Sequence, residues 1–306
     1  MLEKEAGEMN YLVTGGRGML GREFARELAG MPNARHFAPD KHQLDVRDES
    51  AMNAAAKHAE GGWLIHCAAM VSVEDCARNP DTAREIIIDG THHAITTAKS
   101  AGARLFYPQS FLTHDGRVNP IAEEEEQRPL SLYGKLKLDA QHLIEEALGD
   151  DALVVCMAGF FGGEEADKNF VGRIIPVMHA AILRGEESFE VGDRVWQPTW
   201  TRDLAFNSLQ LMLAGARGRY QMACHGAATF AAVAQQIVEA LGWTERLVVV
   251  PVAAAGVSAN ELGRRPDRAV LSCSRLRAEH LDLQRDWRAA LNAYLRHPFF
   301  DRYRFS

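Results

Sequence analysis

The sequence lacks paired cysteines, an excess of basic residues and any long apolar run, and each absence excludes a class of protein. Its five cysteines are odd in number, widely spaced and include no CxxC pair, so neither a disulfide framework nor a zinc knuckle is indicated. Lys and Arg total 34 against 41 Asp and Glu, and the formal net charge of −7 disfavours a broad surface for nucleic acid or anionic membranes. No stretch approaches the ~20 apolar residues of a membrane span, and the N-terminus has no apolar signal core, so we expect a cytoplasmic protein.

The remaining composition is that of an ordinary globular protein. The chain has 306 residues, of which 47% are hydrophobic and 25% charged. This length is about twice the ~150 residues used as a guide for one domain, so we expect one large domain with a smaller appendage, or two domains. His92 and His93 lie on an expected helix with no cysteine or carboxylate at metal-ligand spacing, and no bound metal is expected.

Short β-forming runs alternate with segments of helical periodicity in the first half of the chain. The expected strands cover 11–14, 35–38, 63–67, 104–107 and 152–157, and the expected helices cover 19–29, 50–59, 82–100 and 133–147. This alternation predicts βαβ units and an α/β fold with a doubly wound parallel sheet of the Rossmann type.

Beyond about residue 158 the alternation loosens. Helices are expected over 231–241 and 287–295, with a strand at 246–250 that Pro251 ends. We therefore expect a Rossmann domain over residues 1–157, whose sheet later segments complete, and a smaller mixed domain over residues 158–306 that caps the carboxyl edge of the sheet.

A glycine-rich turn follows the first expected strand. Gly15 permits the tight turn, Gly18 lets the backbone approach a pyrophosphate, and Gly21 allows close helix packing. The free N–H groups at the start of the helix bind the anion. A plain strand-to-helix turn is the alternative, but the position in the first βαβ unit favours a dinucleotide site.

The end of the second strand bears on the choice of dinucleotide. Asp40 can accept hydrogen bonds from both ribose hydroxyls, which points to NAD, or it can serve only as a turn cap. Arg17 and Lys41 can instead clamp a 2′-phosphate, which points to NADP. NADH and NADPH both stay open.

A tyrosine and a lysine lie four residues apart on one predicted helix. Tyr133 and Lys137 therefore share a helix face, where the ammonium would lower the pKa of the phenol and let it exchange a proton near neutral pH. Ser110 follows the fourth strand, at the edge where open α/β sheets bind ligands. A solvated helix face is the alternative for the pair, and the nearby serine favours a catalytic role.

Together these motifs resemble the extended short-chain dehydrogenase/reductase superfamily, and in particular the dTDP-4-dehydrorhamnose reductase family. The resemblance runs through TGGRGMLGRE, LDVRD, CAAMVSVEDCARNP, SFLTHDG, PLSLYGKLKLDAQ, NFV, QPTWTRDLA and RRPDRAVL. It implies that Ser110, Tyr133 and Lys137 are catalytic. It also implies that the cofactor pyrophosphate lies on Gly15, Gly18, Met19, Leu20 and Gly21, the adenine by Asp45 and Val46, and the rest of the cleft on Cys67, Ala68 and Ala69.

The implied reaction is hydride transfer from NAD(P)H to the C4 ketone of a nucleotide-linked 6-deoxy sugar, with Tyr133 as the general acid. The sugar pocket departs from the family pattern at Val71, at Phe111 and at Gly159, which stands in place of a tryptophan. These changes indicate a shifted substrate. Further substrate ligands are expected in the cap: Asn169, Arg173 and Arg265, the arginines as diphosphate ligands or as exposed ion pairs.

The same departures fit a second hypothesis. Some members of this family are regulatory, nucleotide-binding subunits without turnover, and loss of polar substrate contacts would suit that role. We favour the reductase, because a protein that only binds the cofactor has little need for an ordered acid with an adjacent lysine. A homodimer is an additional expectation, and the sequence leaves the sugar and its nucleotide open.

Overall fold

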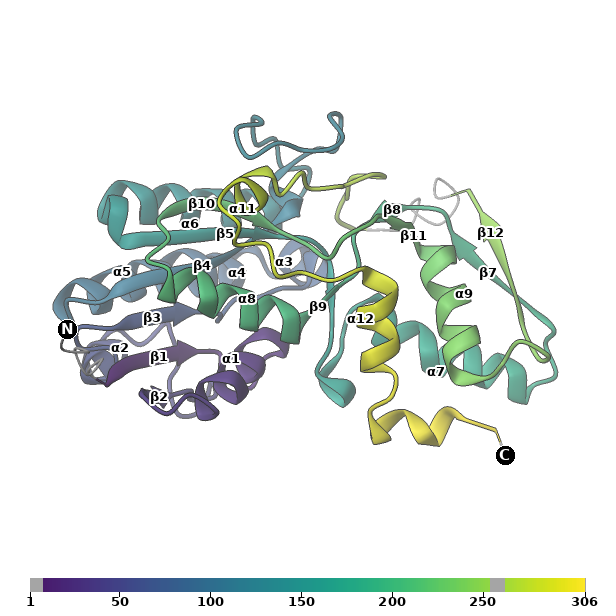
Figure 1. Ribbon diagram of the computed structural model, residues 1–306. Coiled ribbons are helices and arrows are strands. Elements are labelled where there is room, and N and C mark those ends of the chain that lie inside the picture. Colours follow the sequence, from purple (N-terminus) through teal and green to yellow (C-terminus); the bar gives the residue numbers. More distant parts are fainter. Residues whose placement is uncertain (1–7, 254–261, 306) are drawn as a thin grey trace.

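Six parallel strands form the central sheet in the computed structural model, which describes residues 8–253 and 262–305. Their order is β10-β5-β4-β3-β1-β2, so the chain runs outward from β1 in both directions (Figure 1). The strands are β1 (Met9–Thr14), β2 (Ala34–Phe37), β3 (Trp63–His66), β4 (Arg104–Ser110), β5 (Ala152–Met157) and β10 (Gly218–Met222).

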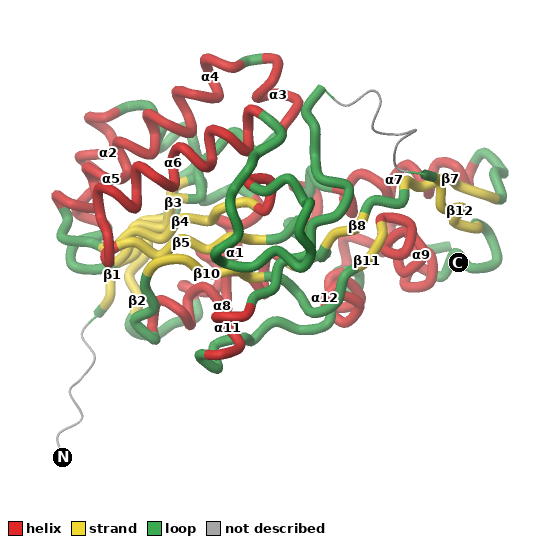
Figure 2. The backbone as a smooth tube through the Cα atoms, turned by 90° about the horizontal axis from the view of Figure 1, so that it is seen from above, coloured by secondary structure: helices red, strands yellow, loops and turns green. Residues whose placement is uncertain are grey.

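Helices cover both faces of this sheet, as Figure 2 shows from above. One face carries α2 (Glu49–Ala55), α3 (Val73–Arg78), α4 (Pro80–Arg84), α5 (Gly90–Ser100) and α6 (Leu132–Leu148). The other carries α1 (Met19–Ala29), α8 (Thr201–Leu213) and α11 (Ser274–Ala278). All six residues of β5 are buried, because a strand covered on both faces must be apolar along its whole length. The predicted doubly wound parallel sheet is confirmed.

A second apolar core lies beside the carboxyl edge of the sheet. It is built from α7 (Phe170–Leu183), α9 (Phe230–Leu241), α12 (Trp287–Tyr294), and the two-stranded sheet of β7 (Ser188–Gly192) and β12 (Val248–Val252). Two further strand pairs are two residues long: β6 (Phe160–Phe161) pairs with β9 (Thr199–Trp200), and β8 (Val195–Trp196) pairs with β11 (Ala228–Thr229). The domain boundary at residue 157 stays a prediction.

The predicted C-terminal ends of two strands that contain proline are wrong. β4 continues through Pro108 to Ser110, whereas the sequence predicts an end at Tyr107. Beyond Phe106 this strand pairs only with β5, so the missing N–H of proline can face the open side. β12 likewise continues through Pro251 to Val252, because it is an edge strand with β7 as its neighbour.

The sequence analysis did not predict the two long helices α7 and α8, nor the short helices α3 and α11. α7 contains Pro176, a residue that normally ends a helix, and α8 is buried over most of its length and so lacks a clear polar stripe. Within the described residues, no helix is long and apolar enough to span a bilayer. The same residues contain no group of three or more side chains arranged to hold a metal ion.

Candidate active site

The glycine-rich turn closes tightly between β1 and α1. Gly15 adopts a φ of +68°, and a Cβ on Gly21 would lie 2.3 Å from the Gly15 carbonyl oxygen, so both positions require glycine. Gly18 is the N-cap of α1, and no side chain in the described part of the protein caps the helix. The first-turn N–H groups at Met19 and Leu20 are therefore suited to an anion such as a pyrophosphate.

Asp40 takes part in a turn and in an ion pair. Its carboxylate accepts hydrogen bonds from the backbone N–H groups of His42 at 2.9 Å and Gln43 at 3.1 Å, and it lies 3.2 Å from Nε of Arg17. The His42 N–H and the other hydrogen bonds lower the pKa of Asp40. The carboxylate is thus ionised and fixed, while Lys41 beside it is exposed. This arrangement places both the acidic and the basic candidate ligands of the cofactor ribose at the end of β2.

The remaining candidate cofactor residues lie at the ends of the neighbouring elements. Ala68 lies close to Gly15: a Cβ on Gly15 would be 3.0 Å from the Ala68 backbone. Cys67 and Ala69 flank Ala68 in the loop after β3. Val46 is buried, and its carbonyl oxygen lies 2.8 Å from Nδ1 of His93. Asp45 forms an ion pair with Arg47 at 2.6 Å, which is an additional role that the sequence did not indicate.

Ser110, Tyr133 and Lys137 lie together at the carboxyl end of β4. Tyr133 is in the first turn of α6, and its side chain lies beside that of Ser110. The start of α6 can approach the end of β4 this closely because residue 134 is glycine. A larger residue at this position would place its Cβ 2.2 Å from the Leu112 carbonyl oxygen. Lys137 is 3% exposed and donates to the Pro108 carbonyl oxygen at 2.8 Å.

The electrostatics of the pair differ from the sequence expectation. Burial raises the pKa of Tyr133 above its usual value, although the neighbouring Ser110 side chain acts to lower it. Burial also lowers the pKa of Lys137 to about 7. The expectation that Lys137 acidifies Tyr133 is wrong for this arrangement, because the ammonium bonds to a backbone carbonyl and desolvation disfavours the phenolate. Tyr133 therefore keeps its proton at neutral pH, which is the form that a general acid needs.

Two residues near Tyr133 and Lys137 were not predicted, because their roles depend on contacts with residues that are distant in the sequence. Gln109 donates to the Lys137 carbonyl oxygen at 2.9 Å and to Gln141 at 2.8 Å, which fixes α6 against β4. His66 is buried, lies 2.9 Å from the Thr14 hydroxyl through Nδ1, and has no partner for Nε2 among the described residues. Burial lowers the pKa of His66 to about 3, so the ring is neutral.

The candidate substrate residues are spread over several elements. Val71 is 58% exposed in the loop before α3, and Phe111 is half-buried directly after Ser110. Asn169 donates to the Phe160 carbonyl oxygen at 2.8 Å and reaches Sδ of Met19 at 3.9 Å, so it joins the cap to the start of α1. Arg173 is exposed on α7.

Arg265 makes a contact across the two parts of the fold. Its guanidinium lies 2.6 Å from the Glu74 carboxylate on α3. The sequence analysis offered an ion pair as the alternative to a diphosphate ligand, and Arg265 forms such a pair. Its side chain is one-quarter exposed. The structure therefore brings Arg265 to α3, the helix that follows the loop after β3, whereas Arg173 lies on α7 of the cap.

The doubly wound sheet, the glycine turn and the Ser-Tyr-Lys group define an extended short-chain dehydrogenase/reductase. Within this class, the chain belongs to the family described as RmlD substrate binding domain, which matches residues 9–299.

Similarity to relatives extends over nearly the whole chain. The dTDP-4-dehydrorhamnose reductase of Streptomyces griseus is 30% identical over 289 residues, which cover 92% of this chain and 91% of that protein. The dTDP-4-keto-6-deoxy-D-glucose reductase of Streptomyces niveus is 28% identical over 283 residues, with coverage of 92% and 94%. The crystal structure of a dTDP-4-dehydrorhamnose reductase from Clostridium acetobutylicum is similar with a TM-score of 0.85 and 27% identity, covering 94% of this chain and 98% of that one.

Proposed function

We propose that the protein is an NAD(P)H-dependent reductase of a nucleotide-linked 4-keto-6-deoxy sugar. The observation that carries this proposal is the buried Tyr133, beside Ser110 and with Lys137 on the same helix face. Relatives named as reductases of dTDP-linked keto sugars, similar over nearly the whole chain, support the substrate class.

The residues at the turn after β1 fit a dinucleotide. The open first turn of α1 would hold the pyrophosphate, and Gly15, Gly18 and Gly21 leave room for it. When bound, the reduced nicotinamide supplies the hydride. Asp40 would bind the ribose hydroxyls of NADH, or Arg17 and Lys41 the 2′-phosphate of NADPH, in which case the phosphate competes with Asp40 for Arg17.

The chain's own residues account for the proton. The Ser110 hydroxyl would donate to the ketone oxygen and orient it, and Tyr133 would donate its proton to that oxygen as negative charge develops there. Lys137 would hold the nicotinamide ribose. In this scheme Val71 and Phe111 shape the sugar pocket, and Asn169, Arg173 and Arg265 bind the nucleotide part of the substrate.

Anaerobic mixing with NADPH or NADH and a panel of dTDP-4-keto sugars tests this function. We expect oxidation of the cofactor with at least one sugar, and a Tyr133→Phe variant should lose about 10²–10⁴-fold in kcat while its cofactor affinity stays nearly unchanged. Equal rates in the variant and the parent would remove Tyr133 from the mechanism. Cofactor binding without oxidation by any sugar would favour the regulatory-subunit hypothesis instead.

Three further expectations belong to this proposal. The division at residue 157 would separate the cofactor-binding part from the mainly substrate-binding part. The protein would act in the cytoplasm, where its reduced cofactor and its free thiols fit. It would form a homodimer, which sedimentation at several protein concentrations can test.

A further inference from the structure

The buried ammonium of Lys137 has few groups to replace the water it has lost. Its Nζ donates to one backbone oxygen, that of Pro108, at 2.8 Å. In the described part of the chain, no carboxylate is among the charges that act on it. A buried cation without a carboxylate partner needs another source of negative potential, because desolvation alone favours its neutral form.

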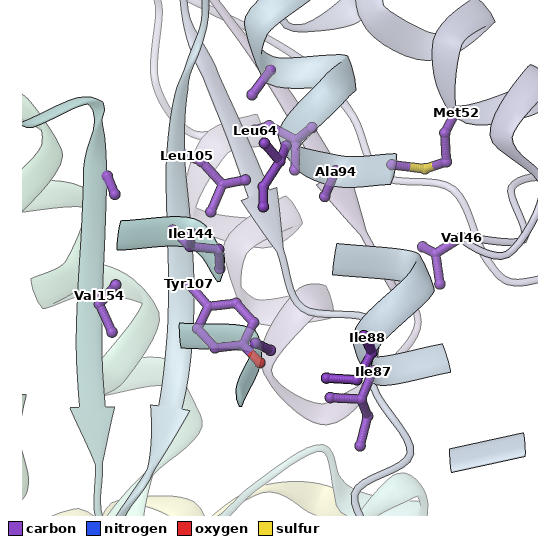
Figure 3. Close-up of a cluster of buried hydrophobic side chains, with 14 of the residues drawn as sticks. Val46, Met52, Leu64, Ile87, Ile88, Ala94, Leu105, Tyr107, Ile144 and Val154 are labelled. Carbon is purple, nitrogen blue, oxygen red and sulfur yellow. The ribbon is translucent and has the colours of Figure 1, made fainter. Parts of the chain in front are cut away.

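The face of the Tyr107 ring provides that potential. Nζ of Lys137 lies 3.6 Å from the ring centroid, well within the range of a cation–π interaction. Tyr107 is 2% exposed, so the interaction is almost free of competing water. Figure 3 shows this ring on β4 among aliphatic side chains, including Ile144 of α6 and Val154 of β5.

The hydroxyl end of the Tyr107 ring faces α5. The Tyr107 hydroxyl lies beside Thr91, whose own hydroxyl donates to the Ile87 carbonyl oxygen at 2.5 Å. Ile87 lies in a π-helical turn, Glu85–Asp89, directly before α5. The ring therefore lies with its hydroxyl end beside α5 and its face under Lys137.

The other titratable groups around Lys137 are neutral near pH 7. His66 has a pKa of about 3, and burial raises the pKa values of Cys67 and Cys156 to about 12. Burial also keeps Tyr133 and Tyr107 protonated by raising their pKa values. These groups come from β3, β4, β5 and α6, and none of them supplies a negative charge for Lys137.

We propose that Tyr107 is the positioning residue of Lys137: its ring face holds the buried ammonium against the Pro108 carbonyl and keeps it charged for its work beside Tyr133. The catalytic part of this inference rests on the proposed function, whereas the effect on Lys137 itself does not. Tyr107 would contact neither the cofactor nor the sugar and would act only through Lys137.

Three substitutions at position 107 separate ring electrostatics from shape. Tyr107→Phe keeps the ring and removes the hydroxyl, and Tyr107→Leu removes the ring. Replacement of Tyr107 by 3,5-difluorophenylalanine keeps the shape of the Phe variant but weakens the negative potential of the ring face. Thermal unfolding checks each variant for folding, and if the Leu variant does not fold, the comparison of the two ring variants still decides the question.

The first readout is the titration of Lys137 in protein labelled with ε-¹³C lysine and prepared without cofactor, with the signal assigned by its loss in Lys137→Met. We expect the pKa of Lys137 to be highest in the parent and the Phe variant, lower in the fluorinated variant, and lowest with Leu, about one pH unit or more below the parent. Equal titration in the parent, fluorinated and Leu proteins would overturn the proposal.

The second readout is the pH profile of turnover. With Leu at position 107, kcat at neutral pH should fall about tenfold, with KM for the sugar unchanged, and part of the loss should be recovered at lower pH where Lys137 is again protonated. A loss of kcat that is independent of pH would contradict the proposal. If the parent protein reduces no sugar, the proposed function fails, and the lysine titration still tests the role of Tyr107.

Discussion

Replacing Lys137 by methionine should stabilise the protein at neutral pH while it abolishes turnover. Lys137 is 3% exposed, and its pKa is about 7, against 10.5 for an ordinary lysine. Between these two values the unfolded chain binds a proton that the folded chain does not, so the stability of the parent rises with pH in this window. Below about pH 7 the folded state carries the full cost of the buried charge.

The size of the stability effect follows from the difference between the pKa of Lys137 in the folded and in the unfolded chain. A difference of about 3.5 pH units at ~1.36 kcal/mol each gives roughly 5 kcal/mol as the upper end of the effect. Methionine has a similar length and no charge, so its variant lacks this dependence on pH. The stability difference, variant minus parent, should therefore shrink by about 3–5 kcal/mol between about pH 6 and about pH 10.

Urea unfolding followed by circular dichroism at several pH values, without cofactor, measures the difference directly. Titrations of other groups are common to both proteins and cancel in the comparison. Lys135→Met is the matched control, because Lys135 lies on the same helix but is exposed. Parallel stability curves for the parent and Lys137→Met across the whole range would refute the claim that Lys137 is a desolvated, titrating lysine.

Two other substitutions test the candidate cofactor and substrate sites. Gly21→Ala places a Cβ 2.3 Å from the Gly15 carbonyl oxygen, so NADPH titration should show at least about tenfold weaker binding and urea unfolding a loss of about 1–3 kcal/mol. Gly30→Ala, whose nearest contact would be 3.4 Å, is its control, and equal cofactor affinity in both variants would contradict the assignment. Arg265→Gln should raise KM for the nucleotide sugar about tenfold with kcat unchanged, whereas an unchanged KM would exclude Arg265 from the substrate site.

Local patterns predicted the parts of the site that depend on spacing within one element. The four-residue interval between Tyr133 and Lys137 and the glycines after β1 are both visible in the sequence, and the structure places both groups at the carboxyl edge of the sheet. The alternation of strands and helices likewise predicted the sheet, since each βαβ unit carries its own periodicity.

Contacts between distant segments could not be predicted in this way. The ring under Lys137 is 30 positions earlier in the chain, and nothing near Tyr107 indicates its role. β4 can continue through Pro108 because its neighbour β3 ends at His66. The local sequence around Pro108 does not show where β3 ends. The direction of the Tyr133 pKa shift was predicted wrongly because burial outweighs the charge of a lysine that bonds elsewhere.

The last strand of the sheet has a consequence for how the chain is made. β5 ends at Met157 and its outer neighbour β10 begins only at Gly218, so roughly sixty residues of largely cap sequence leave the ribosome before that edge is paired. During this interval an apolar strand presents unsatisfied backbone groups, which is a template for association with another nascent chain. Severing the protein after residue 157 would make that exposure permanent, because β10 would be lost with the rest of the chain.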